Sequence, residues 1–313
     1  DATWLNCGRK AVRDDTGYLH AVFQNGTQVC YANSTDNGKT WSKPVSLNGT
    51  SLAGWNPVMA CSGTTLYVAW MEDANIHHVM LKRSTDRGNT WSAATTIYEP
   101  NDYWGVNGED VAIAASGVNV YVVWRVDNGG QWDDFLYFRR STDSGANWFA
   151  YQQLTDTNWG TFLDDRHPSV AASGTNCFIT YTRYLATGPE TFFLRSVNQG
   201  QTFNAAPGTQ LSATLTGQTL YSSLAADGNN LFVAFQDNAA GNWSIFFRSS
   251  ADGGVNWIPA VANPATNISG ANRTSQYPTV ASNGTNATVM WEDNFDHATG
   301  DIFFSYYNGS AFQ

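Results

Sequence analysis

Apolar and polar positions alternate along the chain in short blocks, without long helical stripes. Apolar runs that end in an aromatic residue recur at 66–70, 120–124, 177–181, 231–235 and 287–291, and they read LYVAW, VYVVW, CFITY, LFVAF and ATVMW. A shorter apolar run and a Gly-containing turn precede each of them, as at 57–60 and 111–114. Because the runs are short, rich in β-branched and aromatic residues and bounded by turn residues, they predict β-strands.

A polar phrase follows the third apolar segment of each unit. STDNGKTW at 34–41 returns as STDRGNTW at 84–91 and STDSGANW at 141–148, with weaker copies at 196–203, 250–257 and 305–312. Its aspartate position falls at 36, 86, 143, 198, 252 and 307, so the steps are 50, 57, 55, 54 and 55 residues. Six units of this length, each built from short strands, predict an all-β fold: a six-bladed β-propeller of four-stranded antiparallel blades.

The repeat assigns residues 1–313 to a single domain. We expect the blades roughly at 7–50, 51–100, 101–156, 157–212, 213–264 and 265–313. The sixth unit ends just after its phrase and lacks a fourth strand, whereas ATWLN at 2–6 belongs to no unit. Because an open ring would expose two sheet edges, we expect the N-terminal segment 1–6 to pair into the last blade and close the ring.

The repeated phrase resembles the Asp-box, or bacterial neuraminidase repeat, and the chain is similar to sialidase-like propellers over essentially its whole length. Physically, the aspartate can accept backbone N–H groups across the tight turn. The glycine allows positive φ, and the tryptophan can pack between neighbouring sheets. A residue that is present in every blade supports every blade, so we interpret these phrases as structural.

Strand order predicts where ligand-binding residues gather. The loops that enter the first strands and leave the second strands share one face of the propeller, which we call the upper face, and the repeated phrases lie on the other. The residues that open the first strands on the upper face vary, with five residue types at six positions, and they are Arg9, Asn56, Asp110, His167, Tyr221 and Tyr277. Scaffold positions in this chain repeat, so this group of unlike polar residues predicts a ligand floor; the alternative is a solvated ring around a water-filled channel.

Tryptophans that belong to no repeat position fall in or beside the upper loops. They are Trp55, Trp104, Trp132, Trp159 and Trp243. Indole rings on one face can stack on sugar rings or on another apolar ligand. The alternative is that they hold long loops against the propeller.

The resemblance to sialidases implies a set of catalytic and binding residues. Three arginines of that family bind the sialate carboxylate, and their counterparts here would be Arg9, Arg166 and Arg273. The family's Tyr–Glu pair would correspond to Tyr277 and Glu190. The family's acid/base aspartate lies on a first-blade loop after the second strand, and the short loop Gln24–Gly26 has no carboxylate there. Without a proton donor, departure of the leaving group loses a factor of roughly 10²–10⁴.

Carboxylates on the upper face offer a second route to catalysis. Glycosidases need two carboxyl groups about 5–9 Å apart. Glu109 or Asp110 with Asp165 or Glu190 would supply such a pair. The sequence has no EF-hand spacing and no zinc motif. We therefore expect no metal and no cofactor, with Ca²⁺ in the upper loops as the alternative left open.

Charge and composition narrow the class of partner. The net charge is −10 and the isoelectric point is about 4.7, so a nucleic-acid phosphate backbone would be repelled. No apolar run approaches the roughly 20 residues that span a bilayer. Low lysine content and Asn-x-Ser/Thr sequons favour an extracellular or cell-surface protein, which we expect to be a monomer. Cys177 reads as a buried free thiol, whereas Cys7, Cys30 and Cys61 leave one disulfide open.

Three functions are consistent with these features. The first is an extracellular propeller that binds a carbohydrate or glycoconjugate on its upper face through tryptophans and the polar ring. The second is a glycoside hydrolase of sialidase-like fold, with Tyr277, Glu190 and Asp110 as catalytic candidates. The third is a structural protein of a cell surface.

Overall fold

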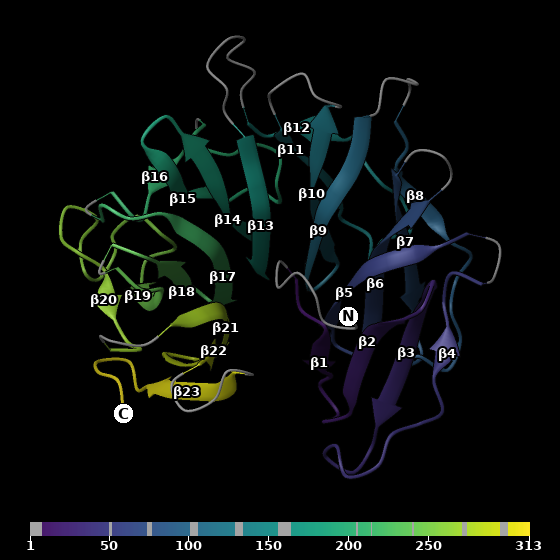
Figure 1. The fold of residues 1–313 in the computed structure, drawn as a ribbon. Helices are drawn as coiled ribbons and strands as arrows, with labels where there is room; N and C mark the ends of the chain where they lie inside the picture. The colour runs from purple at the N-terminus through teal and green to yellow at the C-terminus, as the bar shows by residue number, and fades with distance from the viewer. Residues whose placement is uncertain are drawn as a thin grey trace. The chain divides into compact units, whose positions relative to one another are not determined.

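The computed structural model describes residues 8–49, 52–73, 77–100, 106–128, 134–155, 164–204, 206–213, 215–239, 241–270, 274–294 and 300–313. The chain divides into two compact units, Asp1–Thr155 and Asp156–Gln313. Figure 1 draws the first unit in purple to teal and the second in teal to yellow. Each unit holds three of the six sheets.

The first unit contains three four-stranded antiparallel sheets in which the strands follow one another in chain order. Its first sheet consists of β1 (Ala11–Arg13), β2 (Leu19–Asn25), β3 (Gln28–Ser34) and β4 (Val45–Ser46). The second consists of β5 (Gly54–Ser62), β6 (Thr65–Asp73), β7 (His77–Ser84) and β8 (Thr95–Tyr98). The third consists of β9 (Val106–Ser116), β10 (Asn119–Asn128), β11 (Phe135–Ser141) and β12 (Gln152–Gln153).

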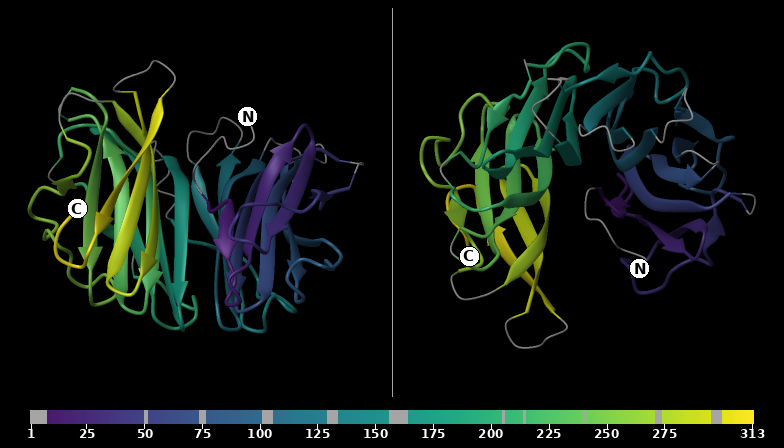
Figure 2. Two further views of the ribbon diagram at one scale, coloured as in Figure 1. Left: turned by 90° about the horizontal axis from the view of Figure 1, so that it is seen from below. Right: turned by 45° about the horizontal axis from the view of Figure 1, so that its top comes forward.

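The second unit repeats this pattern. Its fourth sheet in chain order consists of β13 (Asp164–Ser173), β14 (Asn176–Leu185), β15 (Gly188–Ser196) and β16 (Thr209–Gln210). The fifth consists of β17 (Thr219–Asp227), β18 (Asn230–Asp237), β19 (Ser244–Ser250) and β20 (Thr266–Asn267). The sixth consists of β21 (Ser275–Asn283), β22 (Asn286–Asp293) and β23 (Asp301–Tyr307). The first strands β13, β17 and β21 lie side by side (Figure 2).

The fold class predicted from the repeat, an all-β six-bladed propeller, is confirmed. Six sheets follow one another in the order of the repeats, and the described residues contain no helix. Two details differ from the expectation. Strand β20 lies after residue 264, and the sixth sheet has three strands, to which a bridge between Tyr307 and Phe312 adds a short contact. Residues 1–6, expected to close the last blade, lie outside the described residues.

The core consists of apolar layers between consecutive sheets of the same unit. One cluster joins the second and third sheets, and another joins the fourth and fifth. The aromatic residues that end the apolar runs of the second strands are at most 5% exposed, and they are Trp70, Trp124, Tyr181, Phe235 and Trp291. In the second to fifth sheets the second strand is buried along most of its length, which explains why it reads as a continuous apolar run. In the sixth sheet β22 is buried only at alternate positions.

The repeated polar phrase forms the same hydrogen-bonded turn in five sheets. In the second sheet, Ser84 Oγ donates to Asp86 Oδ1 at 2.7 Å, and the Thr90 amide donates to the same oxygen at 2.9 Å. The Gly88 amide donates to Ser84 Oγ at 2.7 Å, and Arg87 and Gly88 both have positive φ. The same bonds recur around Asp36, Asp143, Asn198 and Asp252. The turn therefore uses a side-chain oxygen, from a carboxylate in four sheets and from the Asn198 amide in the fifth case, to accept backbone and side-chain donors.

The tryptophan of this turn packs against the preceding sheet. Trp91 meets the Tyr31 ring edge-on at 5.0 Å, and Trp257 meets Phe193 in the same way at 4.9 Å. The tryptophan of the first turn differs, because Trp41 is 46% exposed. The bonding and the packing both support a structural role for this phrase.

Candidate functional site

Five of the six residues predicted to open the first strands lie inside those strands, at one kind of backbone irregularity. In sheets two to six, two residues of the first strand face one residue of the second, which defines a β-bulge. The bulged pairs are 56–57, 110–111, 167–168, 221–222 and 277–278. The single residue opposite each pair is the buried aromatic that ends the apolar run, for example Trp70 opposite 56–57. The bulge therefore lies directly over the apolar layer.

The first residue of every such bulge has a left-handed backbone. The φ values are 48° for Asn56, 50° for Asp110, 53° for His167, 51° for Tyr221 and 54° for Tyr277. Asn, Asp and His tolerate this region comparatively well, whereas a tyrosine there is uncommon. Left-handed non-glycine residues cost roughly 1–3 kcal/mol each and cluster at functional sites. Proline follows at positions 57, 168 and 278, and it lacks the N–H group that a bulge leaves unpaired.

In the second unit the three bulge residues form a continuous aromatic row. The ring centroids of His167 and Tyr221 are 4.6 Å apart, and those of Tyr221 and Tyr277 are 5.2 Å apart. The row remains accessible, because His167 and Tyr221 are half-buried and Tyr277 is 40% exposed. These three residues are called the aromatic row below.

In the first unit the corresponding positions carry a different chemistry. Asp110 is buried and lies 3.2 Å from Arg125 Nε, and Arg125 Nη1 donates to Asp134 Oδ2 at 2.5 Å. Asp110 therefore neutralises a buried guanidinium, which reduces its freedom to act on a ligand. Asn56 is half-buried.

Arg9 is the exception among the six opening residues. It is absent from the positive-φ residues, and its carbonyl accepts the Met59 amide at 2.8 Å. Its side chain is exposed. Desolvation by surrounding protein lowers the pKa of Arg9, and the Cys61 thiol opposes this shift. Because arginine titrates far above neutrality, the guanidinium remains charged.

Two further arginines lie beside the aromatic row in the fourth sheet. Arg166 Nη2 donates to Asp164 Oδ2 at 2.8 Å, and its guanidinium lies 5.3 Å from the centre of the Tyr184 ring. Arg183 makes a buried two-pronged ion pair with Asp165, with both N···O distances at 2.7 Å. Arg166 is thus the more accessible cation, whereas Arg183 and Asp165 neutralise each other inside the sheet.

Glu190, predicted as the partner of Tyr277, lies on β15 and is buried. It accepts a short hydrogen bond from the Ser212 hydroxyl. Burial raises the pKa of Glu190, the Ser212 and Gln210 side chains oppose that rise, and the nearby Asp237 carboxylate adds to it. Burial also raises the pKa of Asp237, opposed by the Ala239 amide and the Thr219 hydroxyl. A carboxyl group that holds its proton more tightly than usual has the property that a general acid needs.

The predicted tryptophans divide between core and surface. Trp55 packs on the cluster between the second and third sheets and meets the His77 ring at 4.7 Å. Trp243 is half-buried, and its carbonyl accepts the Ser275 amide. The packing of Trp55 supports the alternative in which such residues hold loops in place. Trp104, Trp132, Trp159 and Arg273 lie outside the described residues.

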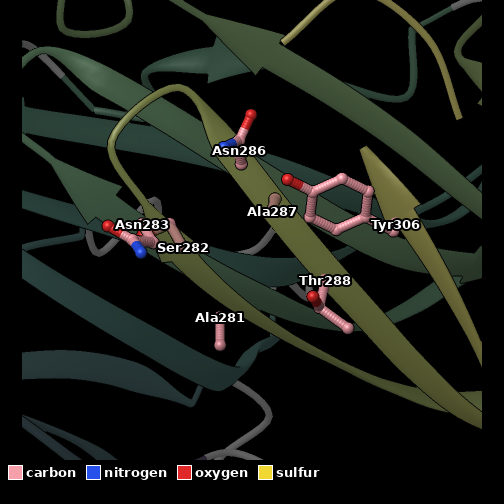
Figure 3. Close-up of a pocket in the computed structure, with 7 residues that line it drawn as sticks. All are labelled: Ala281, Ser282, Asn283, Asn286, Ala287, Thr288 and Tyr306. Atoms are coloured by element: carbon pink, nitrogen blue, oxygen red, sulfur yellow. The ribbon is translucent and has the colours of Figure 1, made fainter. Parts of the chain in front are cut away.

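A small pocket lies on the sixth sheet, far from the aromatic row. Its volume is about 160 Å³ and it is lined by Ala281, Ser282, Asn283, Asn286, Ala287, Thr288 and Tyr306 (Figure 3). It lies around the β21–β22 turn, whereas Tyr277 is near the other end of β21. Ligand pockets usually measure about 300–1,000 Å³. We therefore do not assign it to the site.

The described part of the chain contains Cys30, Cys61 and Cys177, and the structure gives the state of these three cysteines. No three His, Cys, Asp or Glu residues of that part are grouped so that they could hold a metal ion. Cys30, Cys61 and Cys177 form no disulfide with one another, and burial raises the pKa of Cys177 well above its usual value. The described residues also contain no helix long and apolar enough to cross a membrane.

Three supporting residues were not predicted from the sequence. Arg125, Arg183 and Gln236 are buried polar residues on second strands, at or next to the position after the aromatic. A signal was present, because the second sheet has apolar Met71 at the position where the third has Arg125 and the fifth has Gln236. A long polar side chain at a position that is apolar in another repeat marks a local requirement for hydrogen bonding.

Comparison with known proteins shows the fold and leaves the family open. No protein-family model and no curated protein sequence matches the chain. Among solved structures, an α-L-arabinanase of Penicillium chrysogenum complexed with arabinobiose is 15% identical and covers 95% of this chain and 91% of its own, with a TM-score of 0.62. The Hadza microbial sialidase Hz136 is 16% identical, covering 95% and 65%, with a TM-score of 0.57. An ulvan lyase of polysaccharide lyase family PL25 is 12% identical, covering 96% and 79%, with a TM-score of 0.62.

Proposed function

We propose that the protein binds carbohydrate through the aromatic row His167–Tyr221–Tyr277. The observation that carries the proposal is that three consecutive sheets present touching rings from strained, left-handed positions. Aromatic rings stack on the apolar faces of sugars, and their hydroxyl and imidazole groups can bond to sugar hydroxyls. Strain of this kind persists only where the surrounding structure holds it, and functional sites are where it accumulates.

The similar structures support the same class of ligand. Their names describe an arabinanase with arabinobiose, a sialidase and an ulvan lyase, all of which act on carbohydrate. We propose by extension that this protein meets its glycan outside the cell, as a monomer. Arg166, beside the row, would favour sugars that carry a carboxylate or sulfate group, provided that it exchanges Asp164 for the ligand.

The direct test is a binding survey with the wild type and the Tyr221→Ala variant. Arabinobiose, sialyllactose and ulvan oligosaccharides would be titrated by calorimetry, and a glycan array would extend the range. We expect at least one class to bind, and Tyr221→Ala to weaken it about tenfold or more, because the middle ring of the row is lost. Absence of binding to every class by a folded wild type would contradict the proposal.

A matched control comes from the same unit. Tyr306 is 37% exposed and lines the small pocket of the sixth sheet. Tyr306→Ala removes an exposed tyrosine of similar kind, so we expect unchanged affinity. If Tyr306→Ala weakened binding as much as Tyr221→Ala does, the loss would not be specific to the row, and the proposal would be contradicted.

A glycoside hydrolase is the second candidate, favoured by the raised pKa of Glu190. In this role Tyr277 would attack the anomeric carbon and release its phenolic proton to solvent, while Glu190 would donate a proton to the leaving group. The Glu190 carboxylate that results would then take a proton from a water molecule, which would hydrolyse the glycosyl–tyrosine bond and restore both residues. Release of reducing ends from an arabinan or sialoside, abolished by both Glu190→Gln and Tyr277→Phe, would support it. The bond between Glu190 and Ser212 argues for a structural role instead, and retention of full activity by Glu190→Gln would establish that role.

A further inference from the structure

Gln236 is a buried polar residue whose environment satisfies only part of its hydrogen-bonding capacity. It is 0% exposed, and its Oε1 accepts the backbone amide of Tyr277 at 2.8 Å. Its Nε2 has no hydrogen-bond partner among the described residues. A buried amide group with an unmet donor costs about 1–3 kcal/mol. An apolar residue such as Met71, which stands at the equivalent position of the second sheet, would avoid that cost.

The hydrogen bond from the Tyr277 amide to Gln236 joins the fifth sheet to the bulge of the neighbouring sixth sheet. Gln236 lies on β18 of the fifth sheet, directly after the aromatic Phe235, and Tyr277 opens the bulge in β21 of the sixth. Strands β18 and β21 pack against each other. The Tyr277 amide is one of the groups that the bulge removes from its own ladder, and Gln236 supplies the missing acceptor.

The other bulge residues show why Tyr277 benefits from such support. Asn56, Asp110 and His167 are of types that tolerate positive φ. Tyr221 contacts a ring on each side, at 4.6 Å and 5.2 Å. Tyr277 is a bulky residue at positive φ, stands at the end of the aromatic row within its unit and is 40% exposed. A backbone hydrogen bond from the neighbouring sheet restrains it without occupying its ring.

We propose that Gln236 is a positioning residue that fixes Tyr277 in the conformation needed to contact the ligand. The effect of Gln236 on binding rests on the proposed carbohydrate function. Its effect on the Tyr277 backbone does not, and it can be tested without any ligand. Gln236 does not itself touch the ligand, since it is fully buried.

The test uses Gln236→Met, an apolar change of similar length that removes the acceptor. In protein labelled with ¹⁵N-tyrosine, amide hydrogen exchange at Tyr277 is measured by NMR, with Tyr277→Phe identifying the signal. We expect exchange to accelerate about tenfold in Gln236→Met, the fold-change that corresponds to one net hydrogen bond. The Tyr221 amide should be unaffected. Exchange at Tyr277 within twofold of the wild type would overturn the proposal.

The control variant is Thr182→Val. Thr182 occupies the equivalent position of the fourth sheet, is equally buried, and has no hydrogen-bond partner for its hydroxyl among the described residues. The Thr182→Val substitution removes a buried polar group that does not contact Tyr277, so amide exchange at Tyr277 should stay at the wild-type rate. If Thr182→Val accelerated that exchange as much as Gln236→Met did, the effect would reflect general loosening and the proposal would fail.

The consequence for binding is tested by a double-mutant cycle with the glycan that binds best in the survey. Gln236→Met should weaken binding about tenfold in the wild type and leave it unchanged in a Tyr277→Ala background, because the effect acts through Tyr277. An equal loss in both backgrounds would contradict the positioning role. If no glycan binds the wild type, the proposed function fails, while the exchange experiment still decides whether Gln236 holds Tyr277.

Discussion

Asp110 in the first unit and Tyr221 in the second occupy the same bulge of their sheets, with φ of 50° and 51°, yet their side chains serve different ends. Asp110 is buried against Arg125, whereas Tyr221 stacks between His167 and Tyr277 in a row that reaches solvent. One backbone feature therefore presents an ion pair in one unit and a contact surface in the other. The bulge sets where a side chain stands, and the residue type decides whether it stabilises the sheet or faces a ligand.

The greatest loss of stability should come from breaking the ion pair of the first unit. Arg125→Met would leave Asp110 and Asp134 buried without their cation, and removing one partner of a buried pair costs about 3–5 kcal/mol. Chemical denaturation at pH 7 measures this loss. The triple variant that adds Asp110→Asn and Asp134→Asn should recover most of it, since no uncompensated charge remains. A loss below about 1 kcal/mol in Arg125→Met would show that these carboxylates find other partners.

The second-largest effect should come from relieving the backbone strain at Tyr277 in the second unit. Tyr277→Ala and Tyr277→Gly both remove the ring, but only glycine adopts positive φ without cost. We therefore expect Tyr277→Gly to be more stable than Tyr277→Ala by about 1 kcal/mol. The same pair of substitutions at Phe303, which is absent from the positive-φ residues, should favour alanine. Equal stability of the two variants at position 277 would contradict strain at the bulge.

A smaller effect concerns the buried carboxyl of Glu190. Its pKa is raised in the folded protein, so its contribution to stability is fully present below the unfolded pKa and is lost as pH rises through the folded pKa. Glu190→Gln does not titrate. Relative to the wild type it should gain stability between pH 4 and pH 7, because only the wild type loses a contribution as the carboxyl ionises. Denaturation at both pH values provides the comparison, and a relative loss on raising the pH would contradict the direction.

The weakest effect tests the repeated turn, which both units share. Hydrogen bonds lower the pKa of Asp86 to about 2, and the bond from the Thr90 side chain has the largest effect. A depressed carboxyl pKa adds stability above the unfolded value near 4, and that stability is lost as pH falls toward 2. Asp86→Asn should flatten the dependence of melting temperature on pH in this range. The fourth sheet supplies the matched converse, because it has Asn198 in the same turn, and Asn198→Asp should steepen the dependence.

Much of the fold could be predicted from the sequence because the same pattern of strands and turns recurs along the chain. The apolar runs and the Gly turns recur along the chain, and the polar phrase recurs six times, with Asn198 and Tyr307 in place of the aspartate in two copies, so a single misjudged segment does not change the count. The first strands were also located correctly enough to single out Asn56, Asp110, His167, Tyr221 and Tyr277. The bulge was missed, although a proline inside three of these strands, at 57, 168 and 278, is the usual mark of one.

The site was less readable, because its chemistry depends on pairing between strands. Nothing in the spacing of Asp110 and Arg125 states that they meet, and the same holds for Glu190 and Ser212. The sequence left open whether Trp55 contacts a ligand or holds a loop, and only the structure shows that it packs on the core and on His77. Such partners are many residues apart, and a slip of one position in a strand would turn each side chain to the opposite face.

The order of residues along the chain was enough to establish the six β-sheet repeats, the structural turn that follows the third strand, and the positions at which the repeats differ in chemistry. These features follow from the periodicity of apolar residues and from turn conformation, which depend on residues close together in the sequence and not on contacts between sheets. Folding in three dimensions was needed to show that Asp110 is neutralised, that His167, Tyr221 and Tyr277 touch, and that Gln236 accepts the Tyr277 amide. Those outcomes depend on register and on packing between sheets, where distances of a few ångströms between remote residues set the energy.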